Sequence, residues 1–445
     1  MYLHFPLYQP IHFHQMFFIK RYKSAIMLIL IISALQTSAQ QAEDLHQRVQ
    51  QHSEAIFNDL VEVRRDLHRY PEVSGKEEKT SAKVADYLKD LGLEVHTNIG
   101  GYGVVGILQG GKPGKRIAWR ADMDAMPSEE PDVVDFASEI EGVRHICGHD
   151  VHTAVGLGIA NVLSQLKQEL QGTVYFIFQP SEENYEGAKA MINNGLFKKI
   201  DPQEIYGLHI SPWPAGTVAT KSGSVYSHLN SLKITFKNEG KKDALIEDIK
   251  EMVSGFQNVE ADSKFWDFRN LEDPEAGLES PATVFTNFLT VSENFNIRES
   301  AENITMSTLI NTSDKKLMDS LPGKVRQKIL ESPYSSLLEE VVYTYEKITV
   351  NNDEELTFKT LELLADIYGK ESVVPVYGVV PQGRGDDFAY FQQEVPGVYY
   401  FLGGANYESG VISMPHAPDF NVDEESIKFG VEFFSSVLVD RLILR

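Results

Sequence analysis

Between residues 43 and 223, helical patterns of apolar positions alternate with short β-rich runs. Residues 81–93 carry apolar side chains three to four positions apart, which predicts a helix. Apolar runs at 104–108, 116–120, 173–178 and 204–209 predict strands, and a helical pattern at 154–170 precedes the third of them. Strands separated by helices predict a mostly parallel sheet flanked by helices, with right-handed crossovers.

The pattern changes after Gly223. Residues 231–236 and 304–310 alternate as strands do, and a polar stretch with weak helical periodicity, 238–280, lies between them. Helical and buried-strand patterns return at 361–368 and 398–402. A chain of 445 residues also exceeds what one core usually holds. We therefore predict an α/β catalytic domain, residues 43–222 plus 351–445, interrupted by a smaller α+β lid, residues 223–350.

The first 39 residues have a pattern of their own. A basic cluster (Lys20, Arg21 and Lys23) precedes an apolar run at 25–35 and small residues at 37–39. This order is typical of a secretory signal peptide, and the run is short for a membrane span. We expect residues 1–39 to be removed and the mature protein to be exported, periplasmic or secreted, with no membrane span. The alternative is an N-terminal membrane anchor.

Charge and cysteine content narrow the possible partners. The chain has 41 basic and 64 acidic residues and a formal charge of −23, whereas nucleic-acid binding needs a clustered basic face. Nucleic acid is therefore not an expected partner. The chain has a single cysteine, Cys147, so the exported protein forms no internal disulfide and this residue needs another explanation.

The segment around Cys147 contains several metal-ligand residue types. Cys147 and His149 flank Gly148, and thiolate and imidazole are good ligands for zinc or a similar metal. Asp150 is placed to cap the following helix or to orient a ligand imidazole from behind. The alternative is a buried cysteine beside a core histidine.

Further candidate residues follow predicted strands. Glu182 and Glu183 come just after the strand at 173–178, and open α/β sheets place ligand sites at such ends. One carboxylate can bind a metal while its neighbour takes a proton from water. His209 ends another strand, Asp124 follows a third, and His416 lies between two prolines. Each residue has a simpler alternative. Glu182 and Glu183 are then solvated loop acids, Asp124 is a turn residue, His209 is a core histidine and His416 is a surface loop residue.

These motifs together resemble those of the metal-dependent aminoacylases and amidohydrolases, which include hippurate hydrolases, N-acyl-amino-acid amidohydrolases and auxin-conjugate hydrolases. The resemblance covers nearly all of the mature chain. The motifs that carry it, in the family's order, are Asp66–Glu72, Arg120–Pro127, His145–Thr153, Gln179–Glu183, Gly207–His209, Asp387–Tyr390 and His416–Pro418.

The resemblance implies a site and an activity. Its implied metal ligands are Cys147, His149, Glu183, His209 and His416, with the thiolate bridging two divalent ions, zinc or manganese, cobalt and nickel being alternatives. Glu182 would be the general base, and Asp124 would orient a ligand. The implied reaction is hydrolysis of the amide bond of N-acyl amino acids or small peptides, by a homodimer formed through the lid. A dipeptidase or carboxypeptidase with the same centre is the rival enzyme.

The lid departs from the family pattern. Where relatives carry Gly-Gly-His-Ala, residues 237–244 contain no histidine, and the sequence has none between His228 and His416. The usual arginine near 308–312 is absent, and the usual Ser-Glu-Asp reads Gly385-Asp386-Asp387. His228 and Arg384 are candidates to replace the lost substrate contact, the alternatives being a hinge residue and a solvated charge. A poorly active metal-binding relative is the rival from another class.

Overall fold

The computed structural model describes residues 43–443 apart from 241, 382 and 383, together with Met1. The predicted signal peptide, except for Met1, lies outside the described residues. None of the helices in the described part of the chain is long and apolar enough to cross a membrane.

The largest sheet among the described residues has eight strands. Its strands in spatial order are β1 (Glu94–Ile99), β2 (Gly103–Gln109), β6 (Gln171–Gln179), β3 (Lys112–Asp122), β7 (Glu204–Pro214), β17 (Gly397–Ala405), β8 (Val218–Thr220) and β16 (Val373–Pro375). The central strands β6, β3, β7 and β17 run parallel, whereas β1, β2 and β8 introduce antiparallel pairs. The predicted mostly parallel sheet is confirmed, and β17 joins it from far along the chain.

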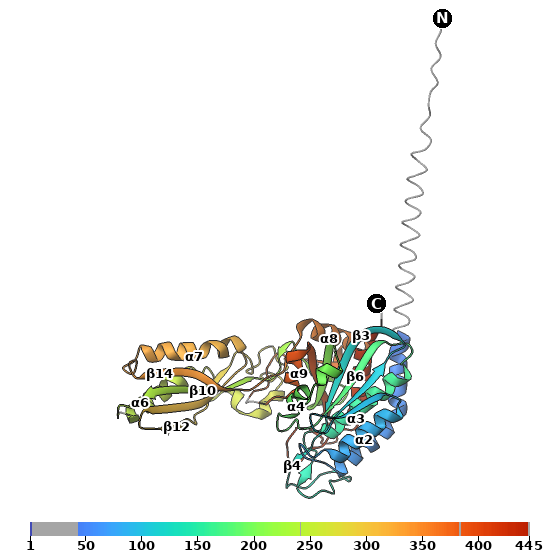
Figure 1. Cartoon of the computed structure of the whole chain (residues 1–445), viewed down its shortest axis with the longest axis horizontal. Coiled ribbons are helices and arrows are strands. Elements are labelled where there is room, and N and C mark those ends of the chain that lie inside the picture. The colour runs from blue at the N-terminus through green and yellow to red at the C-terminus, as the bar shows by residue number, and fades with distance from the viewer. Residues whose placement is uncertain (2–42, 241, 382–383, 444–445) are drawn as a thin grey trace.

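Helices cover both faces of this sheet (Figure 1). One face packs against a helix of residues 43–69, α2 (Glu78–Asp90), α3 (His149–Gln165), α8 (Glu354–Tyr368) and α10 (Glu425–Leu442). The other packs against α4 (Gly187–Asn193), α5 (Leu196–Lys199) and α9 (Phe388–Glu394). The central strands are buried on both faces, which explains their continuous apolar runs in the sequence.

A smaller antiparallel sheet lies to one side, at the left of Figure 1. It contains β11 (Leu289–Val291), β13 (Asn303–Thr312), β10 (His228–Lys237) and β14 (Leu338–Glu346), with β12 (Asn296–Glu299) paired to β13. Helices α6 (Lys242–Ser254) and α7 (Lys315–Leu330) complete its core. Burial alternates along β10, because one face of the sheet packs on the helices and the other does not.

Short elements connect these parts. The two-stranded pairs are β4 (Met126–Pro127) with β5 (Val143–Arg144), and β9 (Gly223–Ser224) with β15 (Asn351–Asn352). The second pair lies where the chain leaves the large sheet for the small one and returns. The 3-10 helices are η1 (Lys264–Trp266), η2 (Phe268–Glu272) and η3 (Lys370–Ser372).

Residues 260–288, which we name the junction segment, pack differently from the rest of the predicted lid range. Its buried side chains Phe265, Leu271 and Phe285 join the core that contains Ile205 and Phe401 of the large sheet. Figure 1 shows it as yellow ribbon where the two parts meet. The sequence did not indicate this contact, because the segment has turns and 3-10 helices rather than a regular apolar period.

Candidate metal centre

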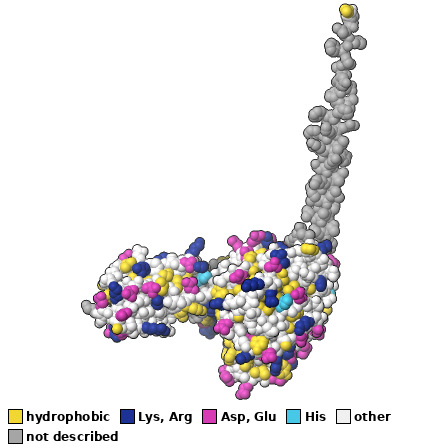
Figure 2. Space-filling model, in the orientation of Figure 1, with side chains coloured by type: hydrophobic (Ala, Val, Ile, Leu, Met, Phe, Trp, Pro, Cys, Tyr) yellow, Lys and Arg dark blue, Asp and Glu magenta, His cyan; other side chains and the backbone are white. Residues whose placement is uncertain are grey.

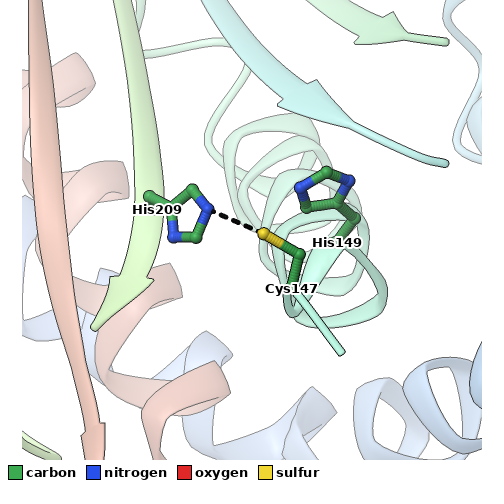
Figure 3. Close-up of side chains that lie close together, drawn as sticks. All are labelled: Cys147, His149 and His209. Atoms are coloured by element: carbon green, nitrogen blue, oxygen red, sulfur yellow. Dashed lines mark hydrogen bonds between the residues drawn. The ribbon is translucent and has the colours of Figure 1, made fainter. Parts of the chain in front are cut away.

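The predicted ligands lie within or beside strands of the large sheet and at the start of α3. Cys147 and His149 flank the start of α3, His209 lies in β7, Glu183 follows β6, and His416 is in the loop after β17. Figure 3 shows the side chains of Cys147 and His149 near the start of α3 and that of His209 reaching towards the thiol from β7.

Short contacts join these side chains into one cluster. The sulfur of Cys147 lies 3.2 Å from His209 Nε2 and 3.1 Å from His416 Nε2. Glu183 Oε1 lies 3.4 Å from His416 Nε2 and 3.8 Å from His149 Nε2. The ligand atoms thus form two groups, Cys147–His149–His209 and Cys147–Glu183–His416, that share the sulfur.

The spacing and chemistry of these atoms fit metal ions. Ligands about 2.0–2.3 Å from a tetrahedral metal lie about 3.3–3.8 Å from one another, which is close to the observed separations. His149 Nε2 is buried and has no hydrogen-bond partner among the described residues. Oxygens of Asp122, Glu182 and Glu183 each lie 3.8 Å from it, so this nitrogen faces a place suited to a cation.

Two histidines have a fixed tautomer. His149 Nδ1 lies 2.8 Å from the carbonyl oxygen of Asp124, and His209 Nδ1 lies 2.6 Å from that of Ile210. A carbonyl oxygen only accepts hydrogen bonds, so each Nδ1 carries a proton. In the neutral imidazole this leaves the Nε2 lone pair of each ring directed into the cluster, as a metal ligand requires.

Asp124 also holds the loop that carries the two glutamates. Its carboxylate accepts hydrogen bonds from the backbone N–H groups of Glu182 and Glu183, both at 3.1 Å, and from the hydroxyl of Ser74 at 2.6 Å. Ser181 in this loop has a left-handed φ of 57°, which is strained for a residue with a side chain. These bonds to Asp124 help to hold the loop in that conformation.

The adjacent glutamates have opposite electrostatic environments. Burial raises the pKa of Glu182 well above its usual value, and the charges of Asp386 and Asp387 add to the effect. Burial also opposes ionisation of Glu183, but contact with His416 and the charge of His149 outweigh it and lower its pKa. Of the two carboxylates, Glu182 therefore holds a proton more readily than Glu183.

Burial and nearby carboxylates also shift the pKa values of Cys147 and His149. Burial raises the pKa of the Cys147 thiol, and the charge of Glu183 raises it further. Burial opposes protonation of His149, but the charge of Asp122 and the hydrogen bond to Asp124 raise its pKa well above the usual value. Surroundings that favour the protonated imidazole also favour a bound cation.

A buried hub around Arg120 was not predicted as part of the site. Arg120 donates to Asp122 at 2.5 Å, to Asp386 at 2.9 Å and to Asp387 at 3.2 Å. Asp122 in turn contacts His152 Nδ1 at 2.6 Å. Charged residues at 120 and 122, alternate positions at the buried end of β3, were the signal that could have revealed it.

Of three other predicted residues, Asp150 and His228 lie away from the cluster and Arg384 lies at its cavity. Asp150 pairs with Arg64 at 2.7 Å and with His68 at 2.9 Å, not with one of the proposed ligand histidines. His228 is buried at the start of β10, 3.2 Å from the hydroxyl of Ser224, and is not among the described residues that line the cavity at the cluster. Arg384 does line that cavity, with its guanidinium 5.1 Å from the ring centre of Phe268.

This cavity has a volume of about 360 Å³. Its polar end is formed by the clustered side chains, including Glu182, Glu183 and His416. Its apolar wall combines Trp213 and Phe401 of the large sheet with Leu271 and Leu278 of the junction segment. The space suits a small organic molecule with one polar end.

Comparison with known proteins places the chain in a family. Residues 118–440 match the sequence model described as Peptidase family M20/M25/M40. The chain belongs to this family. The Bacillus subtilis strain 168 protein named "Putative amidohydrolase YhaA" is 32% identical over 86% of this chain and 94% of its own. Thermostable carboxypeptidase 2 of Saccharolobus solfataricus is 33% identical over 87% of this chain and 96% of its own.

A solved member of the M20 family has a similar structure. The Bacillus subtilis YXEP protein, described as a dinuclear metal-binding peptidase, is 26% identical and covers 87% of this chain and 99% of its own, with a TM-score of 0.69. The resemblance to metal-dependent amidohydrolases is confirmed, and the chain is a metal-dependent hydrolase of amide bonds.

Proposed function

We propose that this M20 enzyme cleaves the amide bond of N-acyl amino acids at a centre of two divalent metal ions. The proposed ligands are Cys147, His149, Glu183, His209 and His416, with Cys147 shared between the ions. The main support is the convergence of these side chains into two groups that meet at one sulfur atom. The description of the YXEP protein as dinuclear supports the metal count.

The residues around the centre have distinct proposed roles. When bound, the ions supply Lewis-acid polarisation and lower the pKa of water. The Glu182 carboxylate takes a proton from the attacking water and delivers it to the leaving nitrogen, and its raised pKa suits both transfers. Asp124 fixes the His149 tautomer and the loop of both glutamates. The apolar wall with Trp213 and Phe401 holds the acyl group or side chain and excludes water.

The identity of the metal follows in part from the ligands. Thiolate and imidazole favour zinc, whereas a carboxylate also suits manganese. We propose zinc or manganese, with cobalt and nickel as alternatives. Activity of the chelated protein after reloading with each ion separately, together with the bound metal content, decides among them.

A carboxypeptidase or dipeptidase is the second candidate function. It is supported by the likeness to thermostable carboxypeptidase 2, which is as similar over its length as the amidohydrolase. Turnover of a matched panel separates the two: N-acetyl and N-benzoyl amino acids against dipeptides with the same C-terminal residue. Fast cleavage of the N-acyl amino acids supports the first proposal, and preference for dipeptides supports the second. No turnover of either, with the metals bound, would favour a poorly active relative that lacks the lid histidine.

We also infer that the mature chain is exported and forms a homodimer through the small sheet. The basic, apolar and small segments of residues 20–39 support export. All four residues of β12 are exposed, so an edge of the small sheet is available for pairing. N-terminal sequencing of the mature protein and sedimentation of the metal-loaded protein test the two inferences.

A further inference from the structure

A lysine lies at the cavity where the small sheet connects back to the catalytic part. Lys347 follows directly after β14, is half-buried, and lines the same cavity as Glu182. Its ammonium nitrogen lies 4.1 Å from the ring centre of Tyr185. Tyr185 belongs to the loop of the two glutamates and has a left-handed φ of 60°. Two segments far apart in the sequence therefore place a cation on an aromatic face beside the proposed general base.

Gly385, in a third segment of the chain, leaves room for Tyr185 and Lys347. A methyl group on Gly385 would lie 3.0 Å from the hydroxyl oxygen of Tyr185 and 3.5 Å from Cε of Lys347. The first distance is shorter than carbon and oxygen normally approach, so a side chain here would displace Tyr185. Gly385 thus allows Tyr185 and Lys347 to occupy their positions. None of these three residues is a proposed metal ligand.

The location of the lysine suggests what it binds. Burial lowers the pKa of Lys347, and the charge of Glu182 opposes that effect. Apart from histidines, the cationic side chains among the described residues of the cavity are Lys347 and Arg384, and Arg384 is exposed. An N-acyl amino acid carries a free carboxylate next to the scissile amide. That carboxylate loses water on entering this largely apolar cavity, so it needs a cation close to the centre.

We propose that Lys347, supported by the ring of Tyr185, binds the free α-carboxylate of the substrate. The site then takes N-acyl α-amino acids, or peptides through their C-terminal residue, and rejects the same compounds when the carboxylate is amidated. This inference rests on the proposed function, because it names the part of the substrate that the catalytic cavity recognises.

The kinetic test compares two substrates in matched variants. Zinc-loaded wild-type protein, Lys347→Met and Lys347→Arg are assayed on an N-acyl amino acid and on its primary carboxamide. Lys189→Met is the control, because Lys189 also lies over a tyrosine ring, that of Tyr390 at 5.9 Å, but does not line the cavity.

We expect Lys347→Met to lower kcat/KM for the acid about 10- to 100-fold, mainly through KM. The carboxamide rate stays within about twofold, Lys347→Arg recovers part of the loss, and the control behaves as wild type. An equal fall in kcat for acid and carboxamide would assign Lys347 to the developing oxyanion and overturn the proposal.

A binding test remains decisive if no substrate is turned over, which is the outcome that would defeat the proposed function. Calorimetry measures the binding of a ketomethylene analogue of the N-acyl amino acid, which cannot be hydrolysed, and of its carboxamide. Tighter binding of the acid by wild type, reduced in both Lys347→Met and Gly385→Ala, supports the carboxylate site on its own. Equal affinity for acid and carboxamide, or an acid preference unchanged in Lys347→Met, overturns it. Thermal unfolding of each variant verifies that it is folded.

Discussion

Glu182 and Glu183 are adjacent in sequence but have different surroundings. The side chain of Glu182 is directed towards the buried carboxylates of Asp386 and Asp387, whereas that of Glu183 contacts His416. The backbone N–H groups of both residues bind the same carboxylate, that of Asp124. A single backbone conformation therefore holds the proposed proton acceptor and the proposed metal ligand side by side.

Substituting each glutamate by glutamine separates the two roles. In Glu182→Gln we expect kcat to fall by at least about 10²-fold, because the proton acceptor is lost while the ligands remain. In Glu183→Gln we expect metal occupancy itself to fall, because an amide is a weaker ligand than a carboxylate. Elemental analysis and steady-state kinetics on the same preparations measure both effects. Equal loss of metal in the two variants would contradict the division of roles.

Sequence reasoning could identify residues of the cluster more readily than the groups that support them. The clustered residues lie in short motifs with recognisable ligand types, such as Cys147-Gly148-His149. The Arg120 hub depends on Asp386, 266 positions away, and no local pattern indicates that these two side chains meet. Lys347 was missed for the same reason, because its neighbours Tyr185 and Gly385 come from other segments.

Among the elements, the start of α3 depends on a single glycine. Gly148 has a φ of 85°, and a methyl group at this position would lie 2.5 Å from Cγ2 of Ile210 in β7. The glycine thus allows the helix to begin close against the strand that carries His209. Cys147 and His149 flank it, so their relative orientation depends on this backbone conformation.

Gly148→Ala should weaken the cluster without removing a proposed ligand. The added methyl group is strained at this φ and pushes α3 away from β7, so we expect a loss of about 1–3 kcal/mol in unfolding free energy and weaker metal binding. Denaturant unfolding and metal titration measure the two effects. Gly92→Ala is a suitable control, because Gly92 also has a positive φ, 78°, but no atom lies within 4 Å of an added methyl group. Equal metal affinity in the two variants would contradict the proposed role of close packing.

Ion pairs at Glu204 join α10 to the strands β7 and β3. Glu204 of β7 accepts hydrogen bonds from Arg441 of α10 at 2.6 and 2.9 Å and from Lys115 of β3 at 2.7 Å. Burial opposes its ionisation, but these partners lower the pKa of Glu204 to about 2. Its side chain is only 9% exposed, so solvent screens the interaction weakly. These ion pairs tie α10 to the first residue of β7, a central strand of the large sheet.

The contribution of the Glu204 ion pairs should be visible in the pH dependence of the unfolding free energy. Glu204 binds its proton less readily in the folded than in the unfolded chain, so its contribution is complete above about pH 4.5 and is lost as the pH falls towards 2. We expect up to about 3 kcal/mol from this group. Glu204→Gln should lower stability at pH 7 and reduce the slope of unfolding free energy between pH 4.5 and 2. Glu169→Gln, in a more exposed pair with Arg48, is the control expected to change little. An unchanged slope in Glu204→Gln would contradict the assignment.

At the scale of the whole molecule, the proposed centre joins distant parts of the chain. Cys147 and His416 are 269 positions apart, yet their ligand atoms lie 3.1 Å from each other. Acidic and basic side chains are interspersed on the face shown in Figure 2, so charge on that face is not gathered into one patch. Ions bound between the segments stabilise the folded state only, since the unfolded chain does not assemble the site.

Metal content and thermal stability test the centre as a unit. We expect the reloaded protein to bind close to two divalent ions per chain, because the ligand atoms form two groups around one sulfur. We expect chelation to lower Tm by several degrees and reloading to restore it. Elemental analysis and calorimetry measure the two quantities. At most one ion at saturation would count against the shared role of Cys147.

The sequence pattern predicted the α/β class better than the arrangement of the strands. Long buried runs such as 173–178 are recognisable because both faces of the sheet are covered. The short strands β8 and β16, three residues each, have no distinctive period. The junction segment was assigned by position to the lid, because its packing on the large sheet depends on side chains far from it in sequence.

The position of β17 has a consequence for the timing of folding. This strand lies inside the large sheet, between β7 and β8, although it is synthesised after the whole small sheet. At about 5–20 residues per second, β7 waits roughly 10–40 s for its neighbour to leave the ribosome. In the early part of the nascent chain β7 is therefore paired with β3 on one side only, and the large sheet cannot be completed before β17 arrives. Such a delay leaves time for a translocation channel to engage an unfolded chain, which suits the export that we propose. It also makes protection from aggregation necessary until residues 397–405 arrive.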